Sequence, residues 1–274
     1  MPFVPPARQA SLPSLALVAL SLAACGPNED EFAAAIVTSA LQSPQAQELA
    51  DDVVHAPCGM LTAEHAAAEA AARPSVALFP ESCVEKTADE ATVHVAFEGC
   101  TGPFGRLRLD GGVDAVFEVT GECRLRADLR DTGLEGNGRP LEYQATADIQ
   151  VLDGFHEIDW NAHVSGTTRR GRTIEQVSAM HVVLDLGTSC RTLEGETDGN
   201  VNGFEYDWGV TGMSICPGEC PSSGVVKAAW HRGRRERNFT VVFDGSKVAK
   251  VTLPSGDTRE VPMACDAAEA EVPE

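Results

Sequence analysis

The chain is poor in aromatic and in basic residues. Aromatic side chains make up 5% of its 274 residues, and 21 Lys and Arg face 41 Asp and Glu, which gives a formal net charge of −20 at pH 7. Such a charge repels the phosphate backbone of DNA and RNA, so we expect no nucleic-acid partner. Hydrophobic residues still reach 43%, which is enough to bury a core and excludes a disordered chain.

The apolar run near the N-terminus is short. It covers residues 12–22, whereas a membrane-spanning helix needs about 20 residues. The run instead has the length of the apolar region of a secretory signal. It ends in Leu22-Ala23-Ala24-Cys25-Gly26, which resembles the lipobox of bacterial secretory lipoproteins.

The resemblance to a lipobox implies an address for the protein. Residues 1–24 would be a signal peptide, and Cys25 would become the first mature residue, with a diacylglyceryl thioether on its sulfur and an acyl group on its new amino terminus. Two or three acyl chains anchor a protein stably, which makes the membrane its first partner. Gly26 in place of Asp after the cysteine implies release to the outer membrane of the cell envelope.

Catalytic signatures are scarce as well. The sequence holds no Gly-flanked serine, phosphate-binding loop or dinucleotide fingerprint. Residues 156–162 resemble the Glu-x-Asp strand of jelly-roll β-glucanases, in which Glu157 would be the nucleophile and Asp159 its electrostatic partner. That family takes its acid from a Glu two or three positions after the Asp, where this chain has Asn161 and Ala162. Retaining hydrolysis needs that second carboxyl group, so an enzyme that acts on glycans ranks third among the functions we expect.

Cysteines, by contrast, are plentiful. Without Cys25 there remain eight, an even number that predicts four disulfides in an exported protein: Cys58, Cys83, Cys100, Cys123, Cys190, Cys216, Cys220 and Cys265. They fall into two groups, 58–123 and 190–265, which predicts two separately linked halves with the pairing open. Cys216 and Cys220 have three residues between them, whereas zinc sites usually have two and a second matching pair. We therefore expect these two cysteines to take part in disulfides and not in a metal site.

The periodicity of the chain divides it into a helical segment and a β domain. Residues 25–74 are predicted to hold the N-terminus that the lipobox resemblance implies is lipidated, and two or three short helices, the last capped by Thr62 and stopped by Pro74. The alternative is a tether that is only partly helical. From 75 to 265 apolar residues recur at every second position. The clearest strands are predicted at 93–97, 113–119, 123–129, 141–151, 158–164, 182–186, 204–208, 239–243, 249–253 and 261–265.

Turn signals separate these strands. They are Gly111-Gly112, Gly136-Asn137-Gly138, Asp244-Gly245 and Ser255-Gly256-Asp257. Many strands at short spacing without helical crossovers predict a mainly β fold: an antiparallel meander that forms a sandwich or a curved half-barrel, followed by an acidic tail at 266–274.

Three further segments resemble cysteine-rich lipoproteins of Gram-negative bacteria, a family without an assigned activity. They are Cys100-Thr101-Gly102-Pro103-Phe104-Gly105, Cys220-Pro221-Ser222-Ser223-Gly224 and the stretch from Phe243 to Cys265. The resemblance implies the address and the β fold only.

One acidic segment has the pattern of a cation loop. Asp198, Asn200 and Asn202 place oxygen atoms at alternate positions, and Gly203 allows the sharp turn, as in the first half of a calcium loop. The position of the bidentate Glu is occupied by Gly209, so Glu205 or Asp207 would have to complete the site. The alternative is a polar turn between strands. We expect no other cofactor.

Two arginine clusters interrupt the acidic background. Guanidinium groups bind phosphate and carboxylate in bidentate fashion, so the clusters would suit anionic lipid headgroups or surface glycans. The alternative is that they are solvated tips of hairpins. The residues are Arg169, Arg170 and Arg172, and Arg232, Arg234 and Arg235.

Together these patterns favour a non-catalytic binding or structural role at the cell envelope. A curved sheet suggests an alternative, in which the protein carries a lipid or another amphiphile in its concavity.

Overall fold

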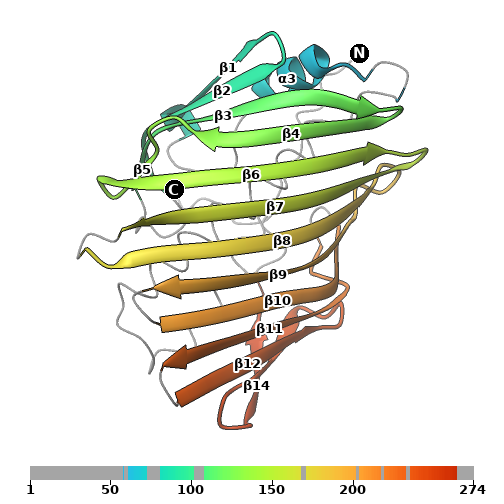
Figure 1. Cartoon of the computed structure of the whole chain (residues 1–274). Helices are drawn as coiled ribbons and strands as arrows, with labels where there is room; N and C mark the ends of the chain where they lie inside the picture. The colour runs from blue at the N-terminus through green and yellow to red at the C-terminus, as the bar shows by residue number, and fades with distance from the viewer. Residues whose placement is uncertain are drawn as a thin grey trace, which may run out of the picture.

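The strands form one open antiparallel sheet. The computed structural model describes residues 58, 61–72, 81–101, 108–167, 171–201, 204–216, 219–232 and 235–263. Its 14 strands follow one another across the sheet in sequence order, except that β5 lies off this path and pairs with β3 and β6 (Figure 1). This confirms the predicted mainly β meander, as a single curved sheet and not as two packed sheets.

Most strands are long. Their bounds are β1 (Val84–Asp89), β2 (Thr92–Thr101), β3 (Arg108–Gly121), β4 (Arg124–Asp131), β5 (Glu135–Gly136), β6 (Arg139–Val151), β7 (Phe155–Thr167), β8 (Thr173–Asp185), β9 (Arg191–Val201), β10 (Phe204–Ile215), β11 (Ser223–Arg232), β12 (Arg235–Phe243), β13 (Val248–Thr252) and β14 (Thr258–Pro262). A short 3-10 turn, η2 (Glu81–Cys83), precedes β1.

Alternation gives the sheet an inner and an outer face. In β6 every second side chain from Leu141 to Val151 is buried, and the side chains between them are exposed or half-buried. We call the face with the buried side chains the inner face and the other the outer face. Successive side chains of a strand point to opposite faces, so a period of two in the sequence becomes one apolar and one polar surface.

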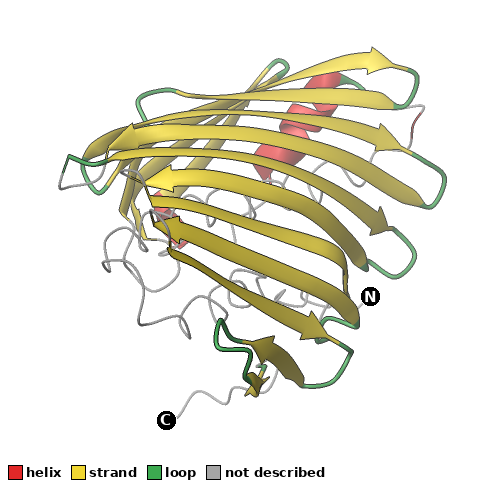
Figure 2. Ribbon diagram, turned by 60° about the horizontal axis from the view of Figure 1, so that its bottom comes forward, coloured by secondary structure: helices red, strands yellow, loops and turns green. Residues whose placement is uncertain are grey.

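Helix α3 (Ala63–Ala72) packs on the inner face. Its N-terminus is capped as predicted, because the backbone N–H of His65 donates to Thr62 Oγ1 over 3.1 Å. Ala66, Ala67 and Ala70 are buried and belong to the same core as β2, β3 and β4. The sheet curves around this helix (Figure 2), which contacts β1, β2 and β3. The other predicted helices lie outside the described residues.

Three of the predicted turns are confirmed. Gly136-Asn137-Gly138 connects β5 to β6, and Asn137 and Gly138 have φ angles of 54° and 70°, as a two-residue hairpin turn requires. Asp244-Gly245 lies between β12 and β13, and 255–257 lies between β13 and β14.

The fourth predicted turn, Gly111-Gly112, is wrong. Both glycines lie inside β3. Gly111 has a φ of 94°, and a Cβ atom there would overlap the carbonyl oxygen of Gly133. The glycine is therefore needed for a close approach of two backbones, and not for a reversal of the chain.

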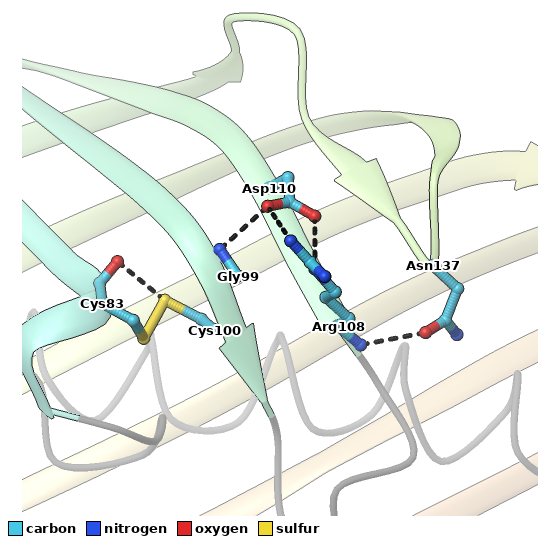
Figure 3. Close-up of polar contacts among 6 residues, drawn as sticks. All are labelled: Cys83, Gly99, Cys100, Arg108, Asp110 and Asn137. Atoms are coloured by element: carbon cyan, nitrogen blue, oxygen red, sulfur yellow. Dashed lines mark hydrogen bonds and ion pairs between the residues drawn. A yellow bond between two sulfur atoms is a disulfide. The ribbon is translucent and has the colours of Figure 1, made fainter.

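A bulge bends the sheet near β2. The register between β2 and β3 shifts between Phe97 and Cys100, and Gly99 in the bulge has a φ of 65°. The backbone N–H of Gly99 donates to Asp110 Oδ1 over 2.8 Å, and Arg108 Nε donates to Asp110 Oδ2 over 3.0 Å (Figure 3). The backbone N–H of Arg108 also donates to Asn137 Oδ1, so this corner ties β2, β3 and the β5–β6 turn together.

The buried residues fall into two core clusters. The N-terminal cluster contains α3 and strands β2 to β7, and reaches Val182 and Leu193. The C-terminal cluster runs from Ile174 and Val201 to Val251 and contains Trp230 and Phe239. The two clusters share one sheet.

Candidate functional site

The structure pairs the predicted cysteines within the two groups. Cys58 bonds to Cys123, Cys83 to Cys100, and Cys190 to Cys216. Cys220 is also disulfide-bonded, and its partner is not among the described residues. Cys25 and Cys265 lie outside the described residues. The three described disulfides each lie within one of the two groups expected from the sequence.

The acidic segment is a hairpin and not a loop. Asp198 and Asn200 lie in β9, and Glu205 and Asp207 in β10; Asp198 pairs with Asp207 and Asn200 with Glu205. Cross-strand partners share a face, so these four side chains lie together on the outer face. Asn202 lies outside the described residues.

This hairpin lacks the wrapped geometry of a calcium loop. The extended backbone spreads the oxygen ligands along two strands, whereas a calcium loop folds them around one point. With Glu175 and His231 they line an open depression of the outer face. In the described part of the chain, no three His, Cys, Asp or Glu side chains are close enough to hold a metal ion.

The arginine clusters flank hairpin connections, as predicted. Arg172 precedes β8, and Arg232 and Arg235 pair at the ends of β11 and β12. Because the sheet is an antiparallel meander, the connections β7–β8, β9–β10 and β11–β12 lie at the same end of the sheet. Arg169, Arg170 and Arg234 lie outside the described residues. Binding of an anionic envelope component by these arginines stays a prediction.

Glu157 and Asp159 lie on the outer face of β7. Asp159 Oδ1 lies 2.8 Å from His181 Nδ1 on the neighbouring strand, and the two side chains are 67% and 42% exposed. Asp148 is the direct neighbour of Asp159 on β6 and pairs with Arg126. The carboxylates of Asp159 and Asp148 are thus engaged in exposed cross-strand pairs.

A buried polar network lies on the inner face where the two core clusters meet. Gln176 and Ser178 in β8 and Thr197 in β9 are at most 2% exposed. The hydroxyl of Tyr206 in β10 donates to Gln176 Oε1, Gln176 Nε2 donates weakly to Ser178 Oγ over 3.4 Å, and Ser178 Oγ lies 2.8 Å from Thr197 Oγ1. Hydrogen bonding offsets the cost of burying these groups.

Beside this network lie buried donors of another kind. Tyr143 is 1% exposed and Trp160 0%. In the described residues, the Tyr143 hydroxyl and the indole N–H groups of Trp160 and Trp208 are buried without a hydrogen-bond partner. Burial raises the pKa of Tyr143 well above its ordinary value, so its hydroxyl keeps its proton. Unpartnered buried donors are uncommon and call for an explanation.

Sequence reasoning did not single out these residues. The alternation in β6 and β7 marks Tyr143 and Trp160 as inward-facing, but it does not say whether their polar atoms find partners. The only signal was two polar residues, Gln176 and Ser178, at inward positions of a strand.

Comparison of the chain with known protein families, with curated proteins and with solved structures found no match. In the described ranges there is no helix whose length and apolar character would let it cross a membrane.

Proposed function

We propose that this protein is exported, is anchored in the cell envelope through Cys25, and carries a lipid or another amphiphile against the inner face of its sheet. Its role is binding and not catalysis. The disulfides support the export, because such bonds form and persist in oxidising compartments. The lipobox at 22–25 supports the anchor.

The observation that carries the binding role is the shape and polarity of the sheet. One curved sheet presents an apolar inner face from β2 to β13, yet α3, the only α-helix of the described residues, contacts β1, β2 and β3. Apolar ligand sites are concave and mostly apolar, with a few polar groups that fix the ligand. The inner face of β6 to β10 combines these properties.

The test is native purification followed by mass spectrometry. Cys25→Ser should yield exported protein without covalent lipid, which is released from the membrane and needs no detergent. This variant should still hold a solvent-extractable amphiphile in a ratio close to one per chain. Labelled fatty acid incorporated equally into wild type and variant would overturn the anchor. Absence of any extractable amphiphile from both proteins would overturn the carrier role and leave a structural one.

A further inference from the structure

One end of the sheet carries most of the exposed large hydrophobic side chains. Because the sheet is an antiparallel meander, the connections β3–β4, β6–β7, β8–β9 and β12–β13 lie at the same end, on the right in Figure 1. We call it the Cys123 end, after the cysteine in its β3–β4 connection. Of the six exposed large hydrophobic side chains in the described part of the chain, four lie within two residues of a strand end there: Val119, Phe155, Leu186 and Val242.

The opposite end differs. Among the side chains that the structure describes, none of these six lies that close to a strand end at the opposite end of the sheet. Its connections β7–β8 and β11–β12 are flanked by arginines instead. Single exposed hydrophobic residues are ordinary, but their concentration at one end indicates a surface with a function.

Two neighbouring turns at the Cys123 end form one apolar surface. The backbone N–H of Leu152 donates to the carbonyl of Phe155 over 2.9 Å and closes the β6–β7 turn. The backbone N–H of Leu186 donates to the carbonyl of Gly154 over 2.9 Å and joins the β8–β9 connection to that turn. Phe155 is 45% exposed and Leu186 36%, and Leu152 is half-buried. We call Leu152, Phe155 and Leu186 the apolar tip.

The turns that form the apolar tip carry little charge. Residues 186–190 hold no charged side chain, and residues 152–155 hold one, Asp153. The neighbouring Asp185 accepts hydrogen bonds from the backbone N–H groups of Gly187 and Thr188. In a chain with a net charge of −20, a nearly uncharged apolar turn is a part that can leave water at low cost in free energy.

Disulfides fix this end and attach the N-terminal chain to it. Cys190–Cys216 links the β8–β9 connection to the residue after β10. Cys58–Cys123 links residue 58 to the β3–β4 connection. The chain that leads to the proposed lipid anchor at Cys25 therefore joins the sheet at the end that carries the apolar tip.

We infer that the apolar tip docks on the surface of a zwitterionic lipid bilayer, with Phe155 and Leu186 inserted among the headgroups and the Cys123 end facing the membrane. This inference rests on the anchor of the proposed function and adds the orientation of the sheet. Apolar side chains next to polar ones bind at the boundary between headgroups and acyl chains. The bilayer is zwitterionic because an anionic surface would repel a chain of charge −20.

Flotation with phosphatidylcholine vesicles tests the apolar tip in the full-length chain. The parent protein is Cys25→Ser, which lacks the proposed lipid. We expect it to bind the vesicles, and we expect addition of Phe155→Ser and Leu186→Ser to weaken binding at least about tenfold, because less apolar surface leaves water. Phosphatidylglycerol in the vesicles should weaken binding of the parent.

The matched control is Val177→Ser in the same parent. Val177 is 53% exposed, more than Phe155 or Leu186, and lies on the outer face of β8 away from the tip. This variant should bind the vesicles like the parent. All variants should keep the melting temperature of the parent, because the substituted side chains are exposed.

Hydrogen exchange of the lipidated wild type gives a second measurement. In phosphatidylcholine vesicles the amides of residues 152–155 and 186–190 should exchange more slowly than in the Cys25→Ser protein in solution. Residues 171–173 at the opposite end should exchange at the same rate in both. Phe155→Ser/Leu186→Ser should remove the protection but leave the covalent lipid in place.

The outcomes separate the apolar tip from the anchor. If the wild type carries covalent lipid, but the tip variant floats like its parent and the tip is not protected, the anchor stands and the tip is wrong. Equal losses in Val177→Ser and in the tip variant would mean non-specific adsorption and would overturn the inference. Self-association of the parent that the tip variant loses would assign the tip to a second copy and would also overturn it. Tip-dependent flotation of a wild type without covalent lipid would overturn the anchor and keep the tip.

Discussion

The two core clusters lie on the same sheet but are built from different side chains. The N-terminal cluster is mostly aliphatic and small side chains, with four aromatic ones among its 26 buried residues, and α3 contributes three buried alanines to it. The C-terminal cluster relies on aromatic rings, with Trp230 and Phe239 in edge-to-face contact at 5.5 Å between ring centroids. Alanines let a helix approach a sheet closely, whereas a face without such a helix needs bulk from its own side chains.

Strands β6 to β9 combine features of both regions. The inward-facing alanines of β6 and β7 belong to the N-terminal cluster, but α3 contacts β1 to β3. The polar network of Gln176, Ser178 and Thr197 lies here, where the two clusters meet. The comparison thus identifies the middle of the sheet as the part least explained by packing alone, and it is there that we place the ligand.

Removal of a disulfide should lower the free energy of unfolding more than truncation of a core side chain or loss of a surface contact. The loss should be larger for a disulfide of the N-terminal half than for one of the C-terminal half. Cys58–Cys123 closes a loop with a sequence separation of 65, and Cys190–Cys216 one of 26. In the entropic description, loss of the first should lower the free energy of unfolding by about 4 kcal/mol and loss of the second by about 3.5 kcal/mol. Urea unfolding of the two double Cys→Ala variants measures both values. A larger loss for the second pair would reverse the comparison.

A peptide map of the same protein completes the cysteine assignment. Six cysteines are paired among themselves; if Cys25 carries the proposed lipid, we expect Cys220 to be linked to Cys265 and no thiol to react in the denatured, unreduced chain. Two reactive thiols would show that the fourth bridge does not form.

Core truncations in the two clusters should be independent of each other. Ile158 belongs to the N-terminal cluster and Phe239 to the C-terminal one. We expect Ile158→Ala and Phe239→Ala each to lower the free energy of unfolding by about 3 kcal/mol. The effects should add to within about 0.5 kcal/mol. Denaturant unfolding of the double variant measures the sum.

The matched control is a pair within one cluster. Ile149 and Ile158 are direct cross-strand partners, so their Ala variants should deviate from additivity by about 1 kcal/mol. Equal coupling in both pairs would mean that the two clusters form a single core.

Most of the fold was predictable because it depends on local periodicity. Alternation from Leu141 to Val151 defines β6, and Thr62 defines the start of α3. The prediction failed where the inner face lacks apolar side chains. Strand β9 places Gly195, Thr197 and Gly199 at inward positions, so the alternation disappears, and its Asp and Asn residues suggested a cation loop instead. Pairing with β8 and β10 overrides these local preferences.

The candidate site could not be predicted from the sequence for a different reason. Periodicity identifies the face on which Tyr143 and Trp160 lie, but their missing hydrogen-bond partners depend on cross-strand register. The register of the strands places Ala145 to Thr197 in one row across four strands. These residues are far apart in sequence, so a local sequence pattern cannot show that they are neighbours.

The polar network between the clusters should contribute less to the free energy of unfolding than the core side chains do. Thr197→Val keeps the shape of the side chain and removes the hydroxyl that faces Ser178 Oγ, so we expect a loss of about 1 kcal/mol in the free energy of unfolding. The double variant Ser178→Ala/Thr197→Val should lose less than the sum of the single variants, because no lone hydroxyl is left without its partner. A double-mutant cycle in urea measures this coupling. Strict additivity would show that the contact is not a stabilising hydrogen bond.

The smallest change in stability should come from loss of a surface ion pair at the C-terminal end of the sheet. Its contribution is far smaller than that of the disulfides in the N-terminal half. Lys250 Nζ lies 2.8 Å from Asp244 Oδ2. Hydrogen bonds from Lys250 and Ser246 hold the pKa of Asp244 below its usual range. A carboxyl group whose pKa is lower in the folded than in the unfolded state stabilises the fold above its unfolded pKa of about 4, and this contribution is lost as the pH falls further. Asp244→Asn should therefore lower the melting temperature slightly at neutral pH and progressively less below about pH 4. Melting curves of both proteins across this range test the sign. A difference that grows as the pH falls would contradict it.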